Sequence, residues 1–253
     1  MQITRITGIM ARRLLVNFRV QPDIAALFLP RGVQPKLIRG HAIAGLCLVR
    51  ITHLRLAGFP AFTGLASENI ALRMAVTWKQ AGESRNAVLI LRRETGSRLN
   101  HFIGGRLFPG PQNRALIRAF DSPNLIEISA RGIDAPTTID FAGRPTDRLA
   151  SGSILHTLDE AADFFRGSEC GYSPSFREGW WDGLRLQLDR WDLQPVDVLH
   201  VRSSFIDAFN DIRPGSAILD SAFNMQSIPH TWTAIPSLPL GTIPIAQPQL
   251  LAA

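Results

Sequence analysis

The sequence predicts a β-rich α+β fold built as one mostly antiparallel domain. Several segments alternate apolar and polar residues with the period of a β-strand, and only a few carry the start and stop signals of a helix. Of the 253 residues, 45% are hydrophobic and 19% are charged, which supports a packed core and excludes a disordered chain. No internal repeat or Gly/Ser linker divides the chain.

The first 56 residues predict a strand, a short helix and a second strand. Residues 14–20 and 42–56 are the apolar strand segments. Pro22 suits the first turn of the helix between them, and Pro30 closes that helix. The next predicted strand covers residues 67–78.

Residues 67–78 give the clearest strand alternation in the chain. One face carries Ile70, Leu72, Met74, Val76 and Trp78, and the other carries Asn69, Ala71, Arg73, Ala75 and Thr77. Glu68 is in phase with the apolar face, which makes it the one carboxylate of this strand that we expect beside buried apolar side chains.

The central region predicts a strand at residues 87–91, a helix at 97–108 and a hairpin of strands at 115–120 and 125–130. The clearest helix signal covers residues 158–166. Thr157 and Glu160 form a capping box before it, and Gly167 supplies its end.

The last third predicts strands at residues 184–188 and 196–205. From Ile228 onward the chain holds five of its 17 prolines, too many for a helix or a central strand. We therefore expect a single domain over residues 1–232 and a proline-rich extended arm over 233–253.

The net charge of +6 comes from 25 arginines and two lysines against 21 acidic residues. The arginines are scattered along the chain, which argues against a nucleic-acid interface, since such an interface gathers its cations on one element. Arginine stays charged and offers a planar fork to carboxylates, so several arginines near one cavity predict an acidic small-molecule ligand. The chain also lacks the motifs of nucleotide, dinucleotide and zinc sites, and no cofactor or metal is expected.

Cysteine use and hydropathy indicate a cytoplasmic protein without a membrane partner. Cys47 and Cys170 have no metal-binding spacing, which suits free thiols in a reducing compartment. No run of 18 apolar residues occurs, and arginines interrupt the N-terminal segment where a signal peptide needs an apolar stretch.

One segment is dense in polar groups: RRETGSRLNHFIGGRLFPGP, at residues 92–111. Together with SENIALRMAV, GYSPSF, VRSSF and IPH, it resembles an uncharacterised domain-of-unknown-function branch of the acetoacetate decarboxylase-like superfamily, over about residues 10–232. The resemblance implies a curved antiparallel sheet or closed barrel with a central cavity and a few outer helices. It also implies a homo-oligomer that binds a carboxylated or ketonic metabolite.

The residue that defines decarboxylase chemistry is missing from the matching segment. In that family a G-R-E-x-x-G-x-P-K-K segment supplies a lysine that forms a Schiff base with the substrate. Here Pro111, Gln112, Asn113 and Arg114 stand in its place. None of them offers an amine that can become neutral and attack a ketone. Lys36 and Lys79 lie near turns and strand ends, where we expect them to be solvated.

The resemblance implies that Glu68 is the acid or base of the site. The alternative is a solvated Glu68, or one paired with an arginine at the strand end. Arg92 and Arg93 must point to opposite faces of their strand, which leaves one of them toward a cavity and the other at the surface. The ligand-binding candidates are Arg93, Arg98, Arg106, Asn100, Tyr172 and His230. A structural role is the alternative for each.

Three functions follow as hypotheses. The first is a small-molecule-binding protein, with lysine-independent lyase, hydratase or isomerase activity as its enzymatic form. The second is a noncatalytic ligand-binding or scaffold protein, in which the arginines only make internal ion pairs. The third is a basic surface for polyanions, which requires a contiguous positive face.

Overall fold

The computed structural model describes residues 3–80, 82–167 and 169–243, which form thirteen strands, four α-helices and one short 3-10 helix. The strands are β1 Arg5–Val20, β2 Val33–Pro35, β3 Leu37–Ile38, β4 His41–Leu56, β5 Leu65–Gln80, β6 Glu83–Thr95, β7 Asn113–Ser122, β8 Leu125–Gly132, β9 Thr138–Pro145, β10 Cys170–Pro174, β11 Trp181–Leu188, β12 Gln194–Ser203 and β13 Ala217–Leu238. The helices are α1 Pro22–Ala26, η1 Ala61–Thr63, α2 Arg98–Ile103, α3 Leu158–Arg166 and α4 Ser204–Ile212.

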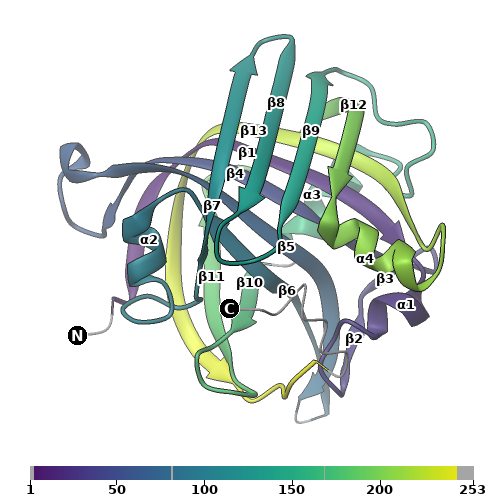
Figure 1. Ribbon diagram of the computed structural model, residues 1–253, viewed down its shortest axis with the longest axis horizontal. Coiled ribbons are helices and arrows are strands. Elements are labelled where there is room, and N and C mark those ends of the chain that lie inside the picture. Colours follow the sequence, from purple (N-terminus) through teal and green to yellow (C-terminus); the bar gives the residue numbers. More distant parts are fainter. Residues whose placement is uncertain (1–2, 81, 168, 244–253) are drawn as a thin grey trace.

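Two rings of hydrogen-bonded strands share five members. β13, β1, β4, β5 and β6 pair side by side, all antiparallel. In the first ring, β10 pairs parallel with β6, β11 pairs with β10, and β11 returns to β13. In the second ring, β7 pairs parallel with β6, and β8, β9 and β12 lead back to β13. In Figure 1, β7, β8, β9 and β12 stand at the top of the view, and β10 and β11 lie in its lower half beside β6.

The shared strands bury both of their faces because a ring closes over each. On β5, Ile70, Leu72 and Met74 belong to the core that fills the second ring with Ile128 of β8 and Phe141 of β9. The opposite face of β5, with Ala71, Arg73 and Ala75, lines a cavity inside the first ring. Alternate residues of one strand therefore serve a solid core and a hollow interior.

The β-rich fold with few helices is confirmed, and two of its strand pairings are parallel, which the sequence did not predict. α3 covers the predicted residues, with Thr157 Oγ1 accepting from the N–H of Glu160 and Glu160 Oε2 accepting from the N–H of His156. The predicted helix at 97–108 is shorter, because Gly104 ends α2 after Ile103.

In the last third, the observed strands differ from the predicted ones at two places. The strand at 196–205 ends at Ser203, whose side chain caps the unpredicted helix α4 by accepting from Phe205 N. The expected proline-rich arm is in part a strand, because β13 runs without a break to Leu238 and pairs with β1 and β11. The boundary at residue 232 thus falls inside β13, and residues 244–253 of the arm lie outside the described part of the chain.

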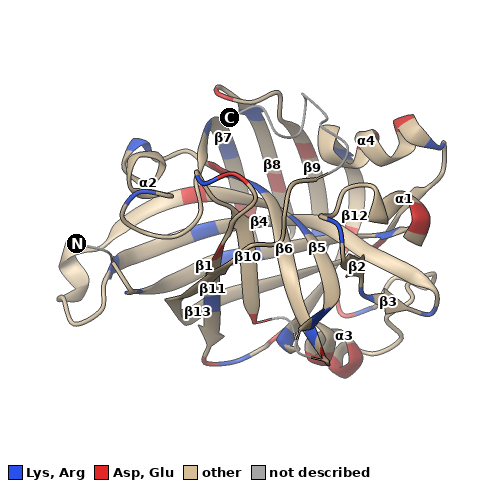
Figure 2. Ribbon diagram, turned by 90° about the horizontal axis from the view of Figure 1, so that it is seen from below, with Lys and Arg blue, Asp and Glu red and all other residues tan. Residues whose placement is uncertain are grey.

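Charged positions are spread over the fold. In Figure 2 basic and acidic positions occur along the same strands and on both rings. Over the described ranges, no helix combines the length and the apolar character needed to cross a bilayer.

Candidate functional site

A cavity of about 390 Å³ lies inside the first ring. Most of its wall is apolar, contributed by β1, β4, β5, β6, β11 and β13, with further residues from α2 and α3. The charged and amide-bearing residues of the wall are Arg13, Arg55, Asn69, Arg73, Arg93, Glu94, Asn100, Gln112 and Glu169.

Arg73 is the most buried cation of the wall, with 5% of its surface exposed. Its Nη2 donates to Asn17 Oδ1 at 2.5 Å, and its guanidinium lies 5.1 Å from the centre of the Phe165 ring. Nε of Arg73 has no hydrogen-bond partner within the described chain. The pKa of Arg73 is lowered to about 10, chiefly by burial; Cys47 opposes this effect and the charge of Arg13 adds to it.

Arg13 faces the same cavity from β1. Its guanidinium lies 5.1 Å from the centre of the Trp191 ring, and its Nη1 is 3.9 Å from the sulfur of Met225. In residues 3–80, 82–167 and 169–243, neither Arg13 nor Arg73 is within ion-pair distance of a carboxylate. Two like charges thus share a wall, and in the described chain neither has a carboxylate within ion-pair distance.

Arg93 is another of the four arginines of the wall, and its position agrees with the prediction that one arginine of the pair 92 and 93 faces a cavity. Its Nε donates to Ser173 Oγ at 2.7 Å. Gly110, with φ +87°, lies against it, so that a Cβ there would come within 3.0 Å of Arg93 Nε. Burial lowers the pKa of Arg93 to about 10, against the opposing effect of the Asp182 charge.

The other arginine of this pair, Arg92, was expected at the surface and is buried instead. Its Nε is 3.2 Å from Glu94 Oε1, and the hydroxyl of Thr137 donates to the same carboxyl group. Burial raises the pKa of Glu94, against the effects of Thr137 and Arg92. Glu94 borders the cavity, but its carboxyl group is bonded to two residues that do not line it.

Asn100 lines the cavity from α2, as expected of a ligand-binding candidate. Ser97 caps the helix, accepting from Asn100 N, and this places the Asn100 amide over β5. There its Nδ2 donates to Ser67 Oγ at 3.0 Å. Asn69 and Thr95 continue this polar chain, with Thr95 Oγ1 donating to Asn69 Oδ1 at 2.8 Å.

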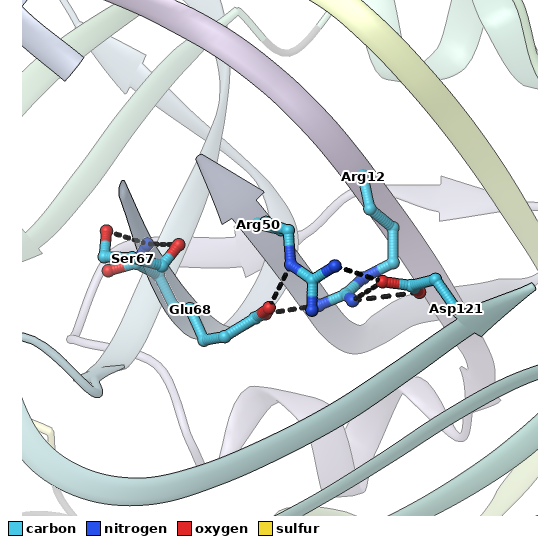
Figure 3. Close-up of polar contacts among 6 residues, drawn as sticks. Arg12, Arg50, Ser67, Glu68 and Asp121 are labelled. Carbon is cyan, nitrogen blue, oxygen red and sulfur yellow. Dashed lines mark hydrogen bonds and ion pairs between the residues drawn. The ribbon is translucent and has the colours of Figure 1, made fainter. Parts of the chain in front are cut away.

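Glu68 lies outside the wall of the cavity, in a four-residue ion-pair cluster (Figure 3). It accepts from Arg12 Nη2 of β1 and from Arg50 Nε of β4, each at 2.5 Å. Asp121 of β7 faces the same two arginines at 2.8 Å. The cluster lies on the face of β5 that points into the second ring, which corresponds to the ion-paired alternative for Glu68.

Three further candidates also lie away from the cavity wall. Arg98 is exposed at the start of α2. Arg106 stacks over the rings of Phe102 and Phe176, with its carbon Cζ 5.6 and 5.2 Å from the ring centres. Tyr172 is buried on the other side of β10, edge-on to Trp78 at 5.9 Å.

His230 is buried directly behind the wall. Its ring lies 4.4 Å from that of Trp232, which does line the cavity. Burial lowers the pKa of His230 to about 4, and the nearby charge of Arg13 acts in the same direction. The imidazole is therefore neutral at physiological pH.

Neither lysine lines the cavity. Lys79 is exposed at the end of β5, as expected. Lys36 is half-buried and its Nζ lies 5.0 Å from the centre of the Phe164 ring, so it is less solvated than expected. At the position matched to the family's lysine segment, the wall carries the amide side chain of Gln112.

Sequence reasoning missed Arg13 and Arg73. The signal for Arg73 was present in the alternation of residues 69–77, whose small and polar face is the one that lines the cavity. Arg13 had no such signal, because a register shift in β1 between Met10 and Arg12 changes the phase of its strand. Within the described ranges, no group of three His, Cys, Asp or Glu residues is placed to hold a metal ion.

A comparison with known protein families shows the family to which this chain belongs. A family of uncharacterised conserved proteins, DUF2071, matches residues 10–218. The chain belongs to the DUF2071 family. None of the curated proteins matches this DUF2071 protein.

Solved structures show the fold of this DUF2071 protein. An acetoacetate decarboxylase-like enzyme from Sphingomonas wittichii RW1 has a TM-score of 0.57 at 12% identity, over 94% of this chain and 95% of that one. Acetoacetate decarboxylase from Legionella pneumophila gives 0.56 at 10% identity, over 92% and 87%. The enduracididine biosynthesis enzyme MppR, solved in complex with pyruvate, gives 0.53 at 12% identity, over 94% and 90%. The predicted membership in a domain-of-unknown-function branch with this fold is confirmed.

Proposed function

We propose that this DUF2071 protein binds a small organic carboxylate in the cavity of the first ring, between Arg13 and Arg73. The observation that carries the proposal is that these two guanidinium groups share an apolar cavity with no carboxylate within ion-pair distance of either in the described chain. Buried charges are stable when they are paired, and an anionic ligand supplies the missing partner.

The acidic residues of the wall do not fill this role. The carboxyl group of Glu94 is bonded to Arg92 and Thr137. The side chain of Glu169 is exposed. A scaffold function requires arginines that are paired internally, so Arg13 and Arg73 favour ligand binding over the scaffold alternative.

The pyruvate complex of MppR supports the chemical class of the ligand, since pyruvate is a small carboxylate. We propose no imine step for this chain, because both lysines lie outside the wall. We also assign no proton transfer to Glu68, whose two carboxyl oxygens are held by Arg12 and Arg50. Catalytic activity, oligomeric state, compartment and the domain boundary stay predictions from the sequence.

Isothermal titration calorimetry with pyruvate, acetoacetate and neutral acetone tests this function. We expect the two carboxylates to bind and acetone not to bind. Arg73→Met keeps the length and apolar volume of the side chain, and it should weaken carboxylate binding at least tenfold, because a charge-assisted hydrogen bond is lost. Arg148→Met, at an exposed arginine outside the cavity, is the matched control. Equal affinities of wild type and Arg73→Met for pyruvate would contradict the proposal.

A further inference from the structure

The polarity of the cavity wall changes along its strands, from a level that carries arginines to a mainly apolar section. The strand register places Arg13 opposite Val49 and Arg73 opposite Gly45, on either side of Cys47 of β4. Ala71 pairs with Cys47 on one side and with Arg93 on the other. Arg13, Arg73 and Arg93, three of the four arginines of the wall, thus lie within two residues, roughly 7 Å along a strand, of the level of Cys47.

The wall beyond this level, toward the start of β1 and β5, is mainly apolar. Its one arginine, Arg55, donates to the backbone carbonyls of Phe59 and His53. Ile6 pairs with Leu56 there, and Leu54 pairs with Leu65. Leu99 of α2 completes this section of the cavity wall. From Ala71 to Leu65 the distance along β5 is six residues, roughly 20 Å in an extended strand. Leu65 and Leu99 are 47% and 45% exposed, so the apolar section is the part of the wall that meets solvent.

The opposite end is buried except beside the exposed wall residue Glu169, which precedes β10. Phe164 and Phe165 of α3 line it, together with Ala75, and each is less than 9% exposed. A ligand that enters from the exposed end therefore passes the apolar section before it reaches the arginines.

From this gradient we infer that the ligand is an amphipathic carboxylate, an acid with an apolar chain or ring, bound with its carboxylate among the arginines and its apolar part against Leu54 and Leu65. The inference rests on the proposed function and names the substrate class of that site. A ligand as small as pyruvate fills only the charged level and leaves the apolar section hydrated, whereas an apolar chain removes that surface from water.

The test is a titration series of butanoate, hexanoate and octanoate, with octanamide as the neutral match for octanoate. We expect affinity to rise about fourfold per methylene, the factor that corresponds to about 0.8 kcal/mol of transfer free energy. Octanamide should bind at least tenfold more weakly than octanoate. A chain-length series with no gain in affinity overturns the amphipathic ligand but leaves the proposed function intact. If none of the acids and neither keto acid binds, the proposed function itself fails.

A pair of variants locates the apolar part. Leu65→Gln lies at an exposed position, so it leaves the fold in place, and it is four residues along β5 from Asn69, which is level with Arg13. The chain of dodecanoate spans this distance of roughly 13 Å, so we expect Leu65→Gln to weaken dodecanoate binding three- to tenfold while the affinity for pyruvate is unchanged. Leu116→Gln, on the outer surface of β7 and 64% exposed, is the matched control and should change neither affinity. An unchanged affinity of Leu65→Gln for dodecanoate overturns the placement of the chain.

Discussion

Arg50 of β4 and Glu68 of β5 lie directly opposite each other in the strand register, and the Nε of Arg50 donates to the Oε1 of Glu68 at 2.5 Å. Arg12 is next to Arg50 on β1 and shares the same carboxyl group. Asp121 of β7 closes the cluster from the opposite side of the second ring. The cluster joins β7 to three of the shared strands at the end of the core.

Replacing the central carboxylate tests this structural role. We expect Glu68→Gln to lower the free energy of unfolding by about 1–3 kcal/mol, because Arg12 is 97% buried at its side chain and loses a charged partner. Urea unfolding measures the change. Glu83→Gln breaks an exposed pair with Arg85 and should stay within about 0.5 kcal/mol of wild type. Equal effects of the two substitutions would contradict the role.

The buried histidine predicts a pH dependence of stability. His230 has a folded-state pKa of about 4 against an ordinary value of 6.5, so between these pH values the unfolded chain binds a proton that the folded chain does not. The free energy of unfolding therefore falls as the pH drops from 6.5 to 4, and the contribution of His230 amounts to about 3 kcal/mol. Below pH 4 this contribution is constant.

Urea unfolding of wild type and His230→Gln at several pH values between 4 and 7 separates this contribution from those of other groups. The difference in stability between the two proteins should narrow as the pH falls. For His156→Gln, at an exposed histidine, the free energy of unfolding should change with pH in the same way as in wild type. If the free energy of unfolding of His230→Gln also changes with pH as in wild type, the proton affinity of His230 does not change on folding.

Gly45 sets the distance between strands beside the arginines. It lies between Asn17 and Arg73 in the register, and a Cβ at this position would come 2.1 Å from the carbonyl oxygen of Val16. We expect Gly45→Ala to cost about 1–3 kcal/mol in a thermal or urea unfolding experiment, because backbone must move to admit it. Gly152→Ala has open space around it and should be nearly neutral. Comparable stabilities would mean that the strands separate at little cost.

The capping box of α3 fixes the buried end of the cavity. Thr157→Ala removes the acceptor for the N–H of Glu160 and should lower the free energy of unfolding by about 1 kcal/mol. Thr157→Ser keeps an acceptor and should retain most of the stability. If both variants unfold alike, the hydroxyl of Thr157 contributes no capping energy.

Local signals predicted the elements whose stability is local. The helix at residues 158–166 was predicted to the residue, because Thr157, Glu160 and Gly167 mark its ends in sequence. β13 was not, since Pro229 and Pro236 argue against a strand and only pairing with β1 and β11 over 22 residues overrides that preference. Tertiary pairing of this kind leaves no local signature.

The candidate site shows a second limit of prediction from the sequence. The alternation of β5 was predicted correctly, but a pattern cannot tell which of two buried faces borders a hollow. The apolar face of Leu72 and Met74 packs against the second ring, and the small, polar face of Ala71 and Arg73 lines the cavity. Which face is which depends on β7 to β12, strands that are remote in sequence from β5.

In the strands shared by the two rings, alternate residues of one strand have different roles: one set lines the cavity and the other set fills the core. On β5, Ala71 and Ala75 can be exchanged to reshape the chamber, while Leu72 and Met74, which point the other way, keep the neighbouring interior filled. The shape of the cavity can thus change through substitutions at every second position, while the core on the other face of the strand is left as it is.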